Sequence, residues 1–154
     1  MSDHPPSPKR VRGKLEVYST IPRARVNRKY LFSCVGHAAK QLKHGYESLS
    51  FILINDRKMA KLHREYSGIP GTTDVLTFDL TEGKSAPKEG EIYICLDQAR
   101  RQAAEWKVPL YREVARLAAH GTLHLAGFKD KTEAERTKMR RLEDLALLAG
   151  DRRR

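Results

Sequence analysis

Apolar and polar residues alternate or recur along the chain in patterns that predict short strands and helices. Alternation of apolar and polar residues, typical of a strand with one buried face, occurs at Leu15–Thr20 and at Val75–Leu80. A nearly continuous apolar run at Ser48–Ile54 is typical of a central strand, and a further strand is predicted at Glu91–Leu96. Because only the polar connector 81–90 separates the last two strands, we expect them to pair in antiparallel orientation.

Helical spacing of apolar positions predicts helices between and after these strands. The first begins at Asn27 and ends at Gly45, where a left-handed residue costs little. The second is capped by Asn55 and stops at Gly68.

Three more helices follow the last strand without an intervening one. They are predicted to start at Asp97, as an N-cap, at Pro109, as a first helical residue, and at Thr132. Thr132 and Glu135 have the spacing of a capping box, and Gly127 ends the middle helix of the three.

The resulting order, β-α-β-α-β-β-α-α-α, predicts an α+β fold with one four-stranded mixed sheet packed against about five helices. Prolines, serines and basic residues in residues 1–14 predict a disordered basic N-terminal arm. Residues 15–150 are then a single domain, and residues 151–154 are a basic C-terminal tail.

The chain is strongly basic. Its 30 Lys and Arg residues outnumber 19 Asp and Glu residues, which gives a net charge of +11. The two ends contribute +3 and +2, so that +6 remains on residues 15–150. A basic domain with basic ends suits a polyanion, most often nucleic acid, although solubility explains the composition equally well.

Membrane and secreted proteins are disfavoured. The longest strongly apolar run, Phe51–Ile54, is far shorter than the roughly 18 residues of a membrane span, and the start MSDHPPSPKR lacks the apolar core of a signal peptide. Cys34 and Cys95 are too few for a disulfide framework or a four-thiolate metal site. We therefore expect a reducing, cytoplasmic location.

The most informative chemistry lies near the end of the fourth predicted helix. His120 and His124 share one helical face and can bind one metal ion, and Asp130 follows on the loop that Gly127 opens. Two His and one Asp leave a coordination position for water, the pattern of a catalytic zinc. The pair of histidines alone would more often be two ordinary helical residues. Gly121 stands where zincin proteases have a glutamate, which disfavours a peptidase.

Three sequence blocks carry a resemblance to a known family. HGTLHLAGFKD, residues 120–130, resembles the H-G-x-L-H-L-x-G-Y-D-H signature of the YbeY family, bacterial single-domain metal-dependent endoribonucleases of ribosomal RNA maturation. TDVLTF, residues 73–78, is similar to the family segment T-D-V-L-S-F, and GEIYI, residues 90–94, matches its G-D-I-x-I strand. Order and spacing agree, and the resemblance covers about residues 15–150.

The resemblance implies a zincin-like metal site at a helix end, with His120 and His124 as ligands of one divalent ion, expected to be Zn²⁺. Asp130 takes the place of a third His, and it is a competent hard ligand. The implied activity is single-strand-specific RNA cleavage in ribosomal RNA processing, with a metal-bound water attacking the phosphodiester. The implied partners are a ribosomal RNA precursor and the small ribosomal subunit.

A second departure from the family concerns phosphate binding. The family usually has an Arg directly after the Tyr that precedes its T-D-V-L-S-F segment, whereas this chain has Tyr66 followed by Ser67. That change removes a bidentate phosphate clamp, so either another residue (Arg112, Arg116 or Lys129) serves instead or catalysis is weaker than in the family.

Other candidate residues follow from charge and position. Asp74 is the candidate polar group for catalysis, and a turn-forming role explains it equally well. Trp106 and Tyr111 are candidates for base stacking, with core packing the favoured interpretation of the single Trp. The candidate RNA-binding residues are Arg100, Arg101, Arg112, Arg116, Lys129 and Lys131.

The alternative function is a non-catalytic RNA-binding ribosome-assembly factor with a structural metal.

Overall fold

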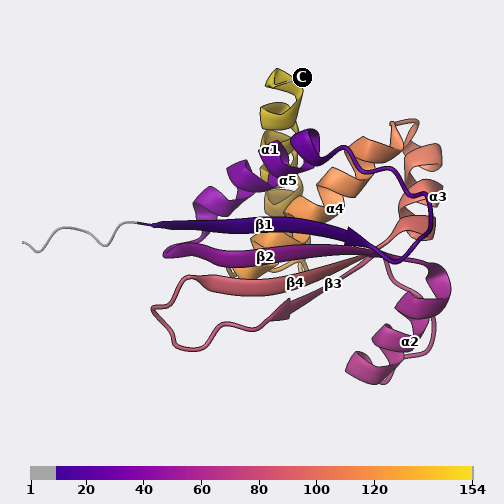
Figure 1. Cartoon of the computed structure of the whole chain (residues 1–154), viewed down its shortest axis with the longest axis horizontal. Coiled ribbons are helices and arrows are strands. Elements are labelled where there is room, and N and C mark those ends of the chain that lie inside the picture. The colour runs from indigo at the N-terminus through magenta and orange to yellow at the C-terminus, as the bar shows by residue number, and fades with distance from the viewer. Residues whose placement is uncertain (1–9, 154) are drawn as a thin grey trace, which may run out of the picture.

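The computed structural model describes residues 10–153, which form one mixed four-stranded sheet and a set of helices (Figure 1). The strand order is β1-β2-β4-β3. β1, β2 and β4 run parallel, and β3 pairs with β4 in antiparallel orientation, as expected from the short connector. The strands are β1 (Val11–Ser19), β2 (Gly45–Ile54), β3 (Val75–Asp79) and β4 (Lys88–Cys95).

Five α-helices and one short 3₁₀ helix are present in the described part of the chain, which confirms the predicted α+β class. No helix among them has the length and apolar character needed to cross a membrane. The helices are α1 (Arg28–Ala38), η1 (Ala39–Gln41), α2 (Asp56–Ser67), α3 (Leu96–Trp106), α4 (Leu110–Leu125) and α5 (Glu133–Arg152).

The main core lies between one face of the sheet and the helices α1 and α4. Leu49, Phe51 and Ile92 on the strands pack in one cluster with Leu31 of α1 and Leu117 of α4. These side chains are at most 2% exposed, so they supply much of the apolar burial that stabilises the fold.

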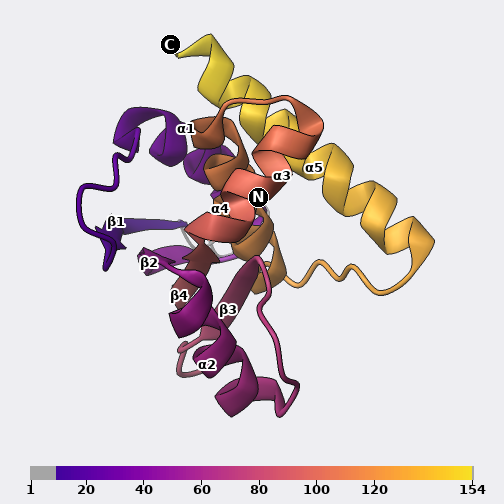
Figure 2. The ribbon, with the colours of Figure 1, turned by 90° about the vertical axis from the view of Figure 1, so that its right-hand side faces the viewer.

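A second cluster joins α1, α4 and α5. Cys34, Ala119, Leu123, Met139 and Leu147 belong to it. α4 therefore has two apolar sides, one toward the sheet and one toward α5, and it is held from both (Figures 1 and 2).

The ends of the domain extend beyond the predicted boundaries. β1 begins at Val11, inside the expected arm 1–14, because Val11 pairs with Gly45 of β2. Residues 1–9 of that arm lie outside the described part. α5 continues to Arg152, and Asp151, expected in the basic tail, is held by an ion pair of 2.7 Å with Arg112.

Side-chain caps are present at three helix starts. Asn27, the predicted start of the first helix, accepts a hydrogen bond from Tyr30 N, and Asn55, a predicted cap, accepts one from Lys58 N. Thr132 forms the predicted capping box.

Three predicted helix boundaries are wrong. Pro109 is the N-cap of α4 and not its first helical residue. Gly45 does not end a helix but opens β2, since η1 already ends at Gln41. Asp97 does not cap α3, which starts at Leu96. Its carboxylate instead accepts a hydrogen bond of 2.8 Å from the Asp56 amide, one of the free N–H groups at the start of α2.

Gly121 lets α4 lie close against the sheet. A Cβ atom at this position would stand 2.7 Å from Cγ2 of Ile92 and 2.9 Å from Oγ1 of Thr77. Position 121 therefore faces the sheet, and the glycine is required by packing.

We predict that Gly121→Ala destabilises the protein relative to Gly36→Ala. Overpacking in a core costs about 1–3 kcal/mol. Both substitutions gain about 1 kcal/mol of helix propensity, but Gly36 in α1 has nothing within 4 Å of its Cβ position. Urea denaturation of the two variants measures the difference. Equal stability would contradict the close packing of α4 on the sheet.

Candidate metal centre

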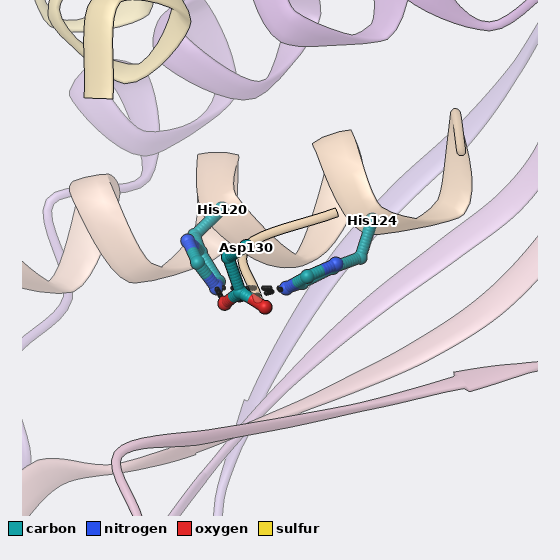
Figure 3. Close-up of side chains that lie close together, drawn as sticks. All are labelled: His120, His124 and Asp130. Atoms are coloured by element: carbon teal, nitrogen blue, oxygen red, sulfur yellow. Dashed lines mark hydrogen bonds and ion pairs between the residues drawn. The ribbon is translucent and has the colours of Figure 1, made fainter. Parts of the chain in front are cut away.

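The predicted ligands His120, His124 and Asp130 come together at the end of α4 (Figure 3). The two Nε2 atoms are 2.9 Å apart, and each lies 3.3 Å from Oδ2 of Asp130. Both histidines project from α4, and Asp130 comes from the loop between α4 and α5, which Figure 2 shows leaving the end of α4. The three side chains are partly buried.

The end of α4 is a Schellman motif built on Gly127, whose φ of +100° is unfavourable for other residues. The Gly127 amide donates to the carbonyl of His124 at 3.0 Å, and the Phe128 amide donates to that of Leu123 at 3.1 Å. This turn places the Phe128 carbonyl 2.9 Å from Nδ1 of His124 and sends the chain back toward Asp130. The predicted role of Gly127 is thus confirmed.

Hydrogen bonds fix the orientation of both imidazole rings. Nδ1 of His124 must be the donor to Phe128, because a carbonyl oxygen only accepts. Nδ1 of His120 donates to Oε2 of Glu143 at 2.7 Å. In the neutral form of each ring, the proton is therefore on Nδ1, and Nε2 presents a lone pair.

Three acceptor atoms consequently face one another with no donor between them. This arrangement is unfavourable unless a cation lies among them, so the residues fit a metal ion. Two ligands at about 2 Å from a tetrahedral zinc stand about 3.3 Å apart, which matches the two distances to Asp130. The Nε2 atoms are closer, at 2.9 Å.

Glu143 belongs to a buried ionic network behind His120. It is 3% exposed and accepts a hydrogen bond of 2.9 Å from Arg116, which also forms an ion pair of 2.7 Å with Glu113. Glu113 is 1% exposed and accepts a further hydrogen bond from Gln102 at 2.6 Å. The network links α3, α4 and α5 to one ligand of the site.

The network also shifts two pKa values. Burial alone would lower the pKa of His120, but the hydrogen bond and charge of Glu143 outweigh it, so the pKa is raised. Burial likewise disfavours charged Arg116, yet its bonds to Glu113 and Glu143 raise its pKa. A proton and a metal ion therefore compete for the lone pair of His120.

A cleft of about 410 Å³ opens on the β3 side of the three ligands. We call it the β3 cleft; it is lined by residues 73–77, Asp79 and Leu125 together with the ligands themselves. Asp74 lies in this cleft, and within residues 10–153 its carboxylate forms no hydrogen bond or ion pair, while its backbone carbonyl accepts from Cys95 N. The structure thus places Asp74 in the same cleft as the three candidate ligands.

Half of the predicted RNA-binding residues are engaged in ion pairs within the protein. Arg101 pairs with Asp56 at 2.7 Å, and Arg112 pairs with Asp151. Arg116 is held in the network of Glu113 and Glu143. The other three form no ion pair within the described range and are exposed: Arg100, Lys129 and Lys131.

The two aromatic residues predicted as candidates for base stacking differ in burial. Tyr111 packs edge-on against Tyr30 with ring centroids 4.9 Å apart, within the α1–α4–α5 core. Trp106 is 52% exposed, so the core-packing interpretation favoured for it is wrong.

Ser67, which stands where the family usually has an Arg, donates a hydrogen bond of 2.7 Å to the carbonyl of His63 and brings no positive charge to the β3 cleft.

Sequence reasoning missed Glu113 and Glu143. Glu113, Arg116 and His120 recur at helical spacing on one face of α4, a signal that pointed to a shared environment. Glu143 lies 23 positions from His120, and nothing in its local sequence distinguishes it from other acidic residues of α5.

The fold and the site define an α+β domain with a two-histidine, one-aspartate centre at a helix end. The family model described as Endoribonuclease YbeY matches residues 20–149. This chain therefore belongs to the YbeY family.

Comparison with individual proteins agrees with this family assignment. Endoribonuclease YbeY of Desulforamulus reducens is 44% identical over 103 residues, covering 62% of this chain and 67% of that protein. Its counterpart in Heliobacterium modesticaldum is 34% identical over 128 residues, covering 75% and 76%. The fold is similar to the solution structure of TM1509 from Thermotoga maritima, with a TM-score of 0.62, 22% identity and 89% of both chains covered.

We predict that Glu143→Gln weakens metal binding about 10- to 100-fold, because the residue that orients His120 and makes it more basic becomes neutral. Competition with a chromogenic chelator measures the affinity. Glu133→Gln, an equal charge change at an exposed position of α5, is the matched control. Equal affinities of the two variants, with both folded by circular dichroism, would contradict the role of Glu143.

Proposed function

We propose that this protein is a zinc-dependent, single-strand-specific endoribonuclease that acts in ribosomal RNA processing. The observation that carries the proposal is the convergence of three metal-binding atoms at the β3 cleft, with both imidazoles oriented from behind. The names of the relatives, Endoribonuclease YbeY, support the reaction class.

The proposed metal ligands are His120, His124 and Asp130. Two imidazoles and one carboxylate are ligands that zinc accepts, and three protein ligands leave a position open. A divalent ion bound here would supply Lewis acidity toward a phosphate and lower the pKa of a coordinated water.

The chain's own residues supply the remaining functions. Glu143 and the Phe128 carbonyl hold the imidazole rings of His120 and His124 in the orientation that directs Nε2 toward the metal site. Asp74 is the candidate general base, since its carboxylate is unbonded within the described residues and lines the same cleft as the ligands. Glu and Asp side chains commonly accept protons in this way.

RNA is the proposed partner, and a ribosomal RNA precursor on the small ribosomal subunit is the proposed substrate, in the cytoplasm. The exposed side chains of Arg100, Lys129 and Lys131 are available to neutralise phosphates, and the last two flank Asp130. The open β3 cleft favours catalysis over a purely structural metal, since a structural site is closed on all sides.

Cleavage of a single-stranded precursor fragment is expected to stop when the metal is chelated and to return when zinc is added. His124→Ala is expected to lose both the metal and cleavage. Asp74→Asn is expected to keep one metal per chain but to cleave about 10²-fold more slowly, because it loses its proton acceptor. Gel analysis of the products, with elemental analysis of each variant, measures both effects.

Glu65→Gln, a carboxylate-to-amide change on an exposed part of α2, is the control and is expected to behave like the wild type. Cleavage that persists in metal-free protein or in His124→Ala would contradict the proposed function. Full activity of Asp74→Asn would remove Asp74 from the chemistry.

A further inference from the structure

We propose that a second groove, on the α5 side of the metal ligands, binds the single-stranded RNA next to the scissile phosphate. We call it the α5 groove. It lies between the α3–α4 connection and α5, is lined by Trp106, Val108 and residues of α5 from Arg136 to Leu147, and has a volume of about 630 Å³. The proposal rests on the proposed function and names where its substrate lies.

The α5 groove and the β3 cleft meet at the metal ligands. His120 and Asp130 line both. A polymer bound at these ligands can therefore continue on either side of them, whereas a small substrate would need only one of the two spaces. The volume of the α5 groove falls within the range of about 300–1,000 Å³ that is typical of ligand sites.

Charge distinguishes the two spaces. Among the described residues that line the β3 cleft, none is Lys or Arg, and Asp74, Asp79 and Asp130 are all present. A phosphate backbone is therefore disfavoured along that side, apart from the phosphate at the metal itself. The α5 groove is lined by four arginines and four carboxylates, so its formal charges balance, whereas the described residues that line the β3 cleft include carboxylates and no Lys or Arg. The α5 groove is therefore the favoured path for a polyanion.

Two of these arginines are free to bind phosphate. Arg112 and Arg116 are committed to carboxylates of the protein. Arg136 and Arg140 are exposed and form no ion pair within residues 10–153. Nη1 of Arg136 donates hydrogen bonds to the carbonyls of Lys131 at 2.8 Å and Asp130 at 3.5 Å, which fixes the side chain beside the ligand loop with further N–H groups available.

Trp106 gives the α5 groove a surface on which a base can stack. Half of its side chain is exposed, at 52%, although large aromatic side chains are usually buried. The Arg116 guanidinium carbon lies 4.8 Å from the ring centroid, which holds the indole in place. Single-stranded RNA is bound in this way, by aromatic rings for bases and cations for phosphates.

The floor of the α5 groove is apolar, with Val108, Met139 and Leu147 among its lining residues. One exposed carboxylate, Asp144, shares the rim with Arg140. Removing this carboxylate should therefore strengthen the binding of an anion, while removing Arg140 should weaken it. These opposite signs distinguish a phosphate-binding groove from an apolar surface for a protein partner.

Trp106 is the only Trp of the chain, so its fluorescence reports on the α5 groove alone. We expect a short single-stranded RNA to quench it in metal-free protein, which cannot cleave the probe under the proposed mechanism. Labelled-RNA anisotropy on zinc-loaded protein gives the affinity of each variant. RNA that binds without changing Trp106 fluorescence would overturn the proposal.

Four substitutions test the groove against a matched control. Trp106→Ala is expected to bind RNA about tenfold more weakly, and Trp106→Phe to restore most of the loss, because stacking needs a ring. Arg140→Ala is expected to reduce the slope of log Kd against log salt by about one, and Asp144→Asn to tighten binding. Arg141→Ala, the next residue of α5 and outside the groove lining, is expected to match the wild type.

The possible outcomes test RNA binding in the α5 groove separately from RNA cleavage. Equal RNA affinity of Arg140→Ala and Arg141→Ala, or of Trp106→Ala and the wild type, would overturn the groove even if the protein cleaves RNA. If RNA quenches Trp106 fluorescence and both Trp106→Ala and Arg140→Ala bind RNA more weakly, but the protein never cleaves RNA, the α5 groove is supported. The same result contradicts the proposed endoribonuclease activity.

Discussion

The hydrogen bond from His120 to Glu143 is the interaction on which the rest of the site depends. It joins α4 to α5 across a buried interface, at 2.7 Å, and it commits Nδ1 of His120 so that Nε2 faces the other ligands. A buried carboxylate without partners would be costly, and Arg116 removes that cost by pairing with Glu143 and Glu113 together. Because two carboxylates share one guanidinium, one net negative charge remains behind His120, and this charge favours a cation at the site.

Backbone geometry supplies the other half of the site. Gly121 allows α4 to approach the sheet, and Gly127 reverses the chain so that the Phe128 carbonyl and Asp130 reach the helix end. His124 is therefore oriented by a backbone atom and His120 by a side chain on another helix. The orientation of His124 therefore depends on the local sequence, and that of His120 depends on the packing of α4 against α5.

This difference explains what the sequence could predict. The three candidate ligands, the Gly127 turn and the caps at Asn55 and Thr132 follow from local patterns, and the structure brings the ligands together and shows the turn and the caps. Glu143, the ion pair of Asp151 with Arg112, and the exposure of Trp106 depend on contacts between elements distant in sequence. Periodicity identifies which face of a helix is apolar, but not which polar residue of another helix meets it.

We propose that His120, His124 and Asp130 hold one metal ion. Crystals of the zinc-loaded protein, measured on both sides of the zinc absorption edge, test this proposal. One anomalous peak is expected about 2.0–2.2 Å from Nε2 of His120, Nε2 of His124 and a carboxylate oxygen of Asp130. A peak elsewhere, or no peak with the two Nε2 atoms still facing Asp130, would contradict it.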